Sequence, residues 1–98
     1  MTMVDYVAAF RGDLDAAEPA LRAMPDAAAG IPLSPGKWSP KEIVGHLIDS
    51  ASVNHERFVR ATQSDDLILP GYDQDAWVVA QRYDRREWAE LLDVWYAF

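Results

Sequence analysis

One helix start constrains this chain more strongly than any other feature of its sequence. Ser39 is a favoured N-cap residue, Pro40 fits the first helical position, and Glu42 follows Ser39 by three residues. This is the spacing of a capping box, in which each side chain bonds the backbone N–H of the other residue. We therefore expect a helix from Pro40 to Ala61 or Thr62, where a polar run follows.

An earlier amphipathic segment predicts a first helix from about Thr2 to Met24. Apolar residues recur there at spacings of three and four, which places them on one face of a helix. Pro19 lies inside this pattern, so we expect a kink or a break near Ala17. The apolar stripe consists of Val4, Val7, Phe10, Leu14, Ala17, Leu21 and Met24.

Two shorter helices are predicted after the long one. Asp73 is placed to cap a helix that ends near Gln81, after an extended stretch with a turn at residues 67–71. Asp84 and Glu87 form a second capping-box-like pair, which predicts a helix up to the end of the sequence. The apolar face of this last helix would contain Trp88, Leu91, Leu92 and Trp95.

Composition limits the fold and the partners. The 98 residues, half of them apolar, make one small domain, residues 1–98, and no segment shows strand-like alternation, so we expect an all-α fold. A net charge of −7 argues against nucleic-acid and anionic-membrane partners. The chain contains no cysteine, and neither a signal peptide nor a membrane span is recognisable. These features predict a cytoplasmic protein.

A polar stripe follows one side of the long helix. At about 100° per residue, Ser50, Asn54 and Arg57 all lie within about 80° of His46, beside the apolar face. A recessed site can be built at such a border between facing helices. His55 lies about 180° from His46, so it cannot join the same site.

Each of these polar residues also has a purely structural interpretation. His46 can be a half-buried histidine that is satisfied by a carbonyl or water. Arg57 and Arg60 can form exposed salt bridges with Glu56 or Asp49. Asp49 itself is expected to be a solvated carboxylate, or a group that supports His46, rather than a ligand.

The same motifs resemble a known family. Trp38-Ser39-Pro40-Lys41-Glu42 followed by Gly45-His46-Leu47-Ile48-Asp49 is similar to the second helix of the DinB-like superfamily. Members often carry an arginine where Arg57 stands, and residues 69–77 resemble their Pro-x-Tyr-Asp-x-x-x-Trp loop. The resemblance implies an up-and-down four-helix bundle, of which about three helices are present in this chain. We expect the last helix to be absent.

The resemblance also implies a function. Members include metal-dependent hydrolases and thiol S-transferases, and they place a metal-binding histidine at the position of His46. A divalent Zn, Ni, Fe or Mn ion is therefore implied, with a low-molecular-weight thiol and a small-molecule substrate. Arg57 and Asn54 are candidates for holding the thiol cofactor. The His-x-x-x-His pair that completes the family's ligand set is not in this sequence, so whether the chain alone is an enzyme stays open.

The alternative is a non-catalytic bundle that binds a small hydrophobic ligand or a partner helix. In that interpretation His46 is structural and the aromatic last helix is the binding surface. With the fourth helix missing, we expect Trp88, Leu91, Leu92, Trp95 and Phe98 to form an exposed apolar face. Such a face predicts a homodimer, in which a second copy supplies the missing layer.

Overall fold

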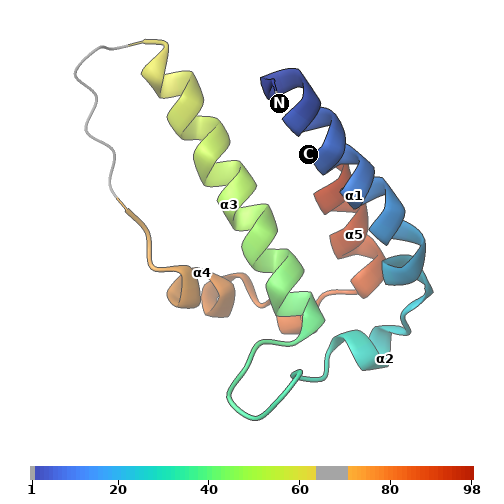
Figure 1. Cartoon of the computed structure of the whole chain (residues 1–98). Coiled ribbons are helices and arrows are strands. Elements are labelled where there is room, and N and C mark those ends of the chain that lie inside the picture. Colours follow the sequence, from blue (N-terminus) through green and yellow to red (C-terminus); the bar gives the residue numbers. More distant parts are fainter. Residues whose placement is uncertain (1, 64–70) are drawn as a thin grey trace.

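The computed structural model describes residues 2–63 and 71–98. The expected extended stretch at residues 67–71 therefore falls almost entirely outside the described residues. Figure 1 shows two long helices, with a shorter one between them and small helices at one end. The elements in chain order are α1 (Met3–Ala23), α2 (Asp26–Ala29), α3 (Pro40–Ala61), α4 (Gln74–Gln81), the 3₁₀-helix η1 (Tyr83–Arg85) and α5 (Trp88–Ala97).

The predicted start of α3 is confirmed. The Ser39 hydroxyl accepts from the Glu42 N–H at 3.3 Å, and the Glu42 carboxylate accepts from the Ser39 N–H at 3.1 Å. Thr2 caps α1 with a second capping box, and Asp73 caps α4 by accepting from the Ala76 N–H. Three helices thus begin where a short polar side chain satisfies their first free N–H groups.

Helix α1 continues without a break through Pro19. Of the kink or break expected near Ala17, the break is therefore wrong. Proline removes one backbone donor from the helix, and the hydrogen bonds on either side of that position are enough to keep α1 in one piece.

The predicted capping box of the last helix is also wrong. Asp84 lies in η1 and pairs with Arg82, and Glu87 makes no side-chain cap bond. The backbone N–H of Trp88 instead donates to Oδ1 of Asp26, a residue of α2, at 2.8 Å. The cap of α5 is therefore supplied from a distant part of the sequence, which local spacing does not indicate.

Asp26 joins three helices. Its Oδ1 accepts from Trp88 in α5 and also lies 2.9 Å from Nζ of Lys41 in α3. The Lys41 side chain is only 7% exposed, so its ammonium group depends on this carboxylate for compensation of its charge. The bond from Trp88, followed by that from Lys41, lowers the pKa of Asp26 below its ordinary value.

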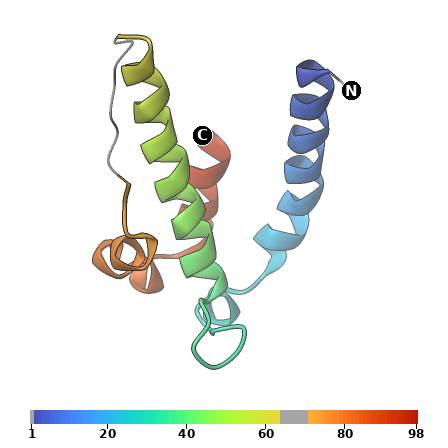
Figure 2. The ribbon, with the colours of Figure 1, turned by 60° about the vertical axis from the view of Figure 1, so that its left-hand side comes forward.

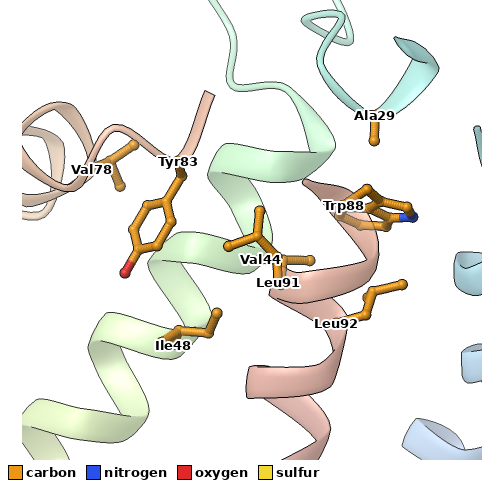
Figure 3. Close-up of a cluster of buried hydrophobic side chains, with 8 residues drawn as sticks. All are labelled: Ala29, Val44, Ile48, Val78, Tyr83, Trp88, Leu91 and Leu92. Atoms are coloured by element: carbon orange, nitrogen blue, oxygen red, sulfur yellow. The ribbon is translucent and has the colours of Figure 1, made fainter. Parts of the chain in front are cut away.

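The hydrophobic core is formed mainly by α3 and α5 (Figure 3). The prediction that the aromatic face of the last helix is exposed is wrong, because Trp88 and Leu91 are each 2% exposed and Leu92 is fully buried. Trp95 is half-buried, and Phe98 alone of that set is largely exposed. The buried apolar residues are Ala29, Val44, Ile48, Val78, Tyr83, Trp88, Leu91 and Leu92.

Helix α1 is fastened to this core at its C-terminal half. Leu21 packs against the core, and its carbonyl accepts from the Trp88 indole at 2.6 Å. Towards the N-terminus, α1 diverges from α3 (Figure 2), and Val4 and Phe10 are 77% and 60% exposed. The radius of gyration is 15.6 Å, against about 13 Å for a compact domain of this size. Val4 and Phe10, two residues of the apolar stripe predicted for the first helix, are therefore not buried by the described residues.

Replacing Asp26 with Asn should destabilise the protein in a pH-dependent way. Because the folded-state pKa of Asp26 is depressed, its contribution is present above the unfolded value near 3.8 and is lost as pH falls through the folded value. Thermal unfolding from pH 2 to pH 7 should show a lower Tm for D26N at neutral pH and a gap that closes in acid. Asp84→Asn is the control and should change Tm little, since Asp84 forms only an exposed pair. Equal effects of the two substitutions would contradict the assignment.

Candidate functional site

Gly45 lets a tyrosine ring lie directly on α3. A Cβ atom at this position would overlap the Tyr83 ring, so only glycine permits the contact. The ring approaches from η1, the short helix between α4 and α5, and is itself 6% exposed. Figure 3 shows Tyr83 on one side of α3, and Leu91 and Leu92 of α5 on the other.

Asp49, one turn after Gly45, accepts hydrogen bonds from the same connection. The Tyr83 hydroxyl donates to Oδ1 of Asp49 at 2.6 Å, and Nε2 of Gln81 donates to the same oxygen at 3.1 Å. Asp49 is 2% exposed, so the expectation of a solvated carboxylate is wrong. Burial, together with the bond to Asp49, raises the pKa of Tyr83 far above its ordinary value, so its hydroxyl remains a donor.

His46 lies between Gly45 and Asp49 in the sequence and is half-buried. Its ring is 5.2 Å from that of Trp38, centroid to centroid, at an angle of 42°. The Nδ1 atom is buried and has no hydrogen-bond partner, and the same holds for Oδ2 of Asp49. His46 is therefore held by the helix and the indole rather than by a bond to a neighbouring carbonyl.

The rest of the polar stripe contacts the segment before α4. Ser50 shares a hydrogen bond of 2.7 Å with the Tyr72 hydroxyl, and the Arg57 guanidinium lies 6.0 Å from the Tyr72 ring centroid. Arg57 also donates to Oδ1 of Asn54 at 3.4 Å. The structure thus connects Ser50, Asn54 and Arg57 around Tyr72. Arg60 pairs with Glu56 at 2.7 Å with both side chains exposed, which confirms the salt-bridge interpretation for that residue.

The described residues supply one histidine to a metal site at this position. They contain no group of three or more His, Cys, Asp or Glu side chains placed to hold an ion. His55, the second histidine of the chain, is exposed. The buried, unpaired Nδ1 shows an imidazole that is not committed to a structural bond, so His46 fits the role of one ligand and not of a complete site.

A separate groove of about 450 Å³ lies between α1 and the end of α5. Arg11 and Asp15 contribute its charged groups, and the remaining walls are apolar or aromatic. None of the candidate metal or cofactor residues lies in it. The apolar and aromatic residues that line it are Phe10, Leu14, Ala51, Trp95, Tyr96, Ala97 and Phe98.

Comparison with known protein families assigns the fold. The model of the DinB superfamily matches residues 9–97, nearly the whole chain. The chain belongs to the DinB superfamily. This confirms the family suggested by the motifs on α3 and the all-α architecture that it implies. Searches of the curated proteins and of the solved structures found no match. In the described part of the chain, no helix is both long and apolar enough to cross a bilayer.

The contact between Tyr83 and α3 was not predicted from the sequence. A weak signal was present, because a glycine and an aspartate four residues apart lie on the same face of a helix and can together receive a tyrosine. The partner was not identifiable, since Tyr83 is separated from Gly45 by almost forty positions of unrelated sequence. The site therefore depends on a long-range contact that local spacing does not reveal.

Replacing Gly45 with Ala should destabilise the protein by about 1–3 kcal/mol, because the added methyl group forces the Tyr83 ring away from α3. Gly12→Ala in α1 is the matched control, since a Cβ there meets nothing within 4 Å. That change should stabilise the protein by about 0.5–1 kcal/mol through helix propensity. Urea unfolding of both variants measures the difference. A stabilising G45A substitution would show that the ring does not lie on this glycine in solution.

Proposed function

We propose that His46 is one ligand of a divalent metal ion, Zn, Ni, Fe or Mn, in a DinB-type metal-dependent enzyme. The reaction would be thiol S-transfer or hydrolysis of a small-molecule substrate. The observation that supports this most directly is the half-buried imidazole with an uncommitted buried nitrogen at the head of the polar stripe. Imidazole is a good ligand for all four metals, and membership of the superfamily supports a metal-associated role.

The bound metal would lower the pKa of a thiol or of a water molecule and so provide the nucleophile at neutral pH. Residues of this chain would shape the surroundings. The ring of Trp38 lies beside the imidazole in a tilted contact, with the ring centroids 5.2 Å apart. Arg57, with Asn54 and the ring of Tyr72 beside it, would hold the anionic group of a low-molecular-weight thiol.

The remaining ligands would come from outside the described residues. A catalytic metal site generally uses three protein ligands and one open position, and the described part of the chain contributes His46. A single imidazole binds divalent metal weakly. The proposal therefore concerns one ligand position. The remaining ligands would determine the metal, the thiol and the substrate.

Metal content should depend on His46 and not on His55. After equilibrium dialysis against each of the four metals at a fixed free concentration, elemental analysis should find bound ion that is lost or strongly reduced in His46→Ala. The matched variant His55→Ala should keep it, because His55 is exposed on another side of α3. An equal loss in both variants would indicate surface binding, and metal retained in H46A would rule out the proposed ligand.

The second candidate function is the binding of a small hydrophobic ligand or a partner helix. It is favoured by the groove between α1 and α5, whose lining is mostly apolar and whose α1 wall includes the exposed Phe10. A homodimer is also proposed here. It would use this groove, since the face first expected to mediate it is buried in the core.

Phe10→Ser should abolish whatever binds in the groove, and Phe58→Ser is the control, because Phe58 is exposed on α3 outside the groove lining. Light scattering at micromolar concentration should give twice the chain mass of 11.0 kDa for the wild type and for F58S, and 11.0 kDa for F10S. Wild-type monomers that bind a fluorescent apolar dye, with binding lost only in F10S, would favour a ligand over a second copy. No dimer and no dye binding would exclude this candidate.

A further inference from the structure

Two buried polar atoms on successive turns of α3 have no hydrogen-bond partner. They are Nδ1 of His46 and Oδ2 of Asp49, and within the described residues they are the buried side-chain atoms left in this state. An unpaired buried polar group costs free energy, so such atoms in a native protein call for an explanation. Here one atom can carry a proton and the other can accept it.

Helix geometry places the two side chains next to each other. Residues three apart in an α-helix are neighbours on its surface, with Cβ atoms about 5–6 Å apart. His46 and Asp49 have this spacing, and neither side chain forms an ion pair or hydrogen bond that would direct these two atoms elsewhere. No hydrogen bond joins these two atoms in the structure, so a bond between them requires the imidazole to turn towards the carboxylate.

The orientation of the Asp49 carboxylate is already fixed from the other side. Tyr83 and Gln81 both donate to Oδ1, which leaves Oδ2 as the oxygen without a donor. The Tyr83 ring is held against Gly45, so its hydroxyl has a fixed position and the carboxylate that it binds cannot rotate freely. The carboxylate thus presents one defined lone-pair site.

We propose that Asp49 is a positioning residue for His46, with Nδ1–H of the imidazole donating to Oδ2. This bond is direct, and it forms when the imidazole turns towards the carboxylate. This inference rests on the proposed role of His46 as a metal ligand and adds the group that prepares it. Aspartate behind a ligating histidine fixes the tautomer, orients the ring and makes the nitrogen a stronger ligand.

The bond decides which nitrogen is free to bind metal. When Nδ1 carries the proton, Nε2 keeps its lone pair and can act as the ligand. Without a partner for Nδ1, a neutral histidine exchanges between the two tautomers, and the ring is held only by Trp38. Asp49 would therefore act through His46 and need not touch the ion or the substrate.

The tautomer of His46 can be read directly in metal-free protein. The chain has two histidines, so His55→Gln leaves a single imidazole whose ¹⁵N shifts and two-bond couplings identify the protonated nitrogen. The spectra are recorded at increasing pH until they no longer change, so that the neutral ring is observed. We expect the Nδ1–H tautomer with Asp49 in place.

Asp49→Asn should reverse this tautomer. The asparagine oxygen is required by the Tyr83 and Gln81 donors, so the NH₂ group must take the position of Oδ2. That group can only donate, and Nδ1 must then accept and leave the proton on Nε2. Metal affinity, measured by titration with Zn²⁺, should fall by about 10- to 100-fold.

Tyr83→Phe is the control that separates positioning from stability. It removes a donor to Oδ1 and leaves Oδ2 unchanged, so the protein should unfold at lower urea concentration while His46 keeps the Nδ1–H tautomer. If D49N does not fold, the spectra of the wild type and Y83F still decide the question. An Nε2–H tautomer in the wild type, or no change in a folded D49N, would overturn the proposal. Since these spectra need no metal, the failure of metal binding alone would contradict the proposed function and not this inference.

Discussion

The contact between Tyr83 and α3 connects the candidate site to the hydrophobic core. Its ring packs where Gly45 leaves room, and its hydroxyl reaches the buried Asp49. Burying a carboxylate costs free energy unless hydrogen-bond donors surround it. The burial of Asp49 therefore depends on the position of the Tyr83 hydroxyl, and the hydroxyl in turn needs Asp49 as its acceptor. Tyr83 lies between α4 and α5 in the chain. The same contact therefore holds the connection between these two helices against α3.

Asp26 has a comparable role at the other end of the core. It caps α5 and compensates the charge of Lys41, and so links α2, α3 and α5 through one carboxylate. The two aspartates differ in exposure, since Asp49 is 2% exposed while the Asp26 side chain is 59% exposed. Solvent can replace part of what Asp26 loses when a partner is removed, whereas nothing replaces a donor lost at Asp49. The loss of a donor should therefore cost more at Asp49 than at Asp26.

Local chemistry made much of the fold predictable from the sequence. The start of α3 follows from Ser39 and Glu42, and the start of α4 follows from Asp73, because a capping side chain acts within three residues of its own position. The start of α5 was not predictable in this way, since its cap is Asp26. Likewise, the burial of Leu92 depends on how the helices pack and not on the pattern that placed it on an apolar face.

The candidate site shows the same division. Periodicity placed His46, Ser50 and Arg57 on one side of α3, and the structure brings Ser50 and Arg57 together at Tyr72. The periodicity did not indicate that Asp49 is buried, because no residue near Asp49 in the sequence predicts hydrogen bonds from Gln81 and Tyr83. A charged residue on a polar-looking turn is expected to be exposed unless a distant partner compensates it.

The motif Gly45-His46-Leu47-Ile48-Asp49 therefore combines two kinds of requirement. Its glycine and its aspartate both contribute to packing, because together they receive Tyr83. Its isoleucine belongs to the core, and its leucine is partly exposed. The histidine is the member that no contact in the core accounts for, since its buried nitrogen is left without a bond. A residue that stability does not explain, held in place by residues that stability does explain, is the arrangement expected of a ligand on a rigid support.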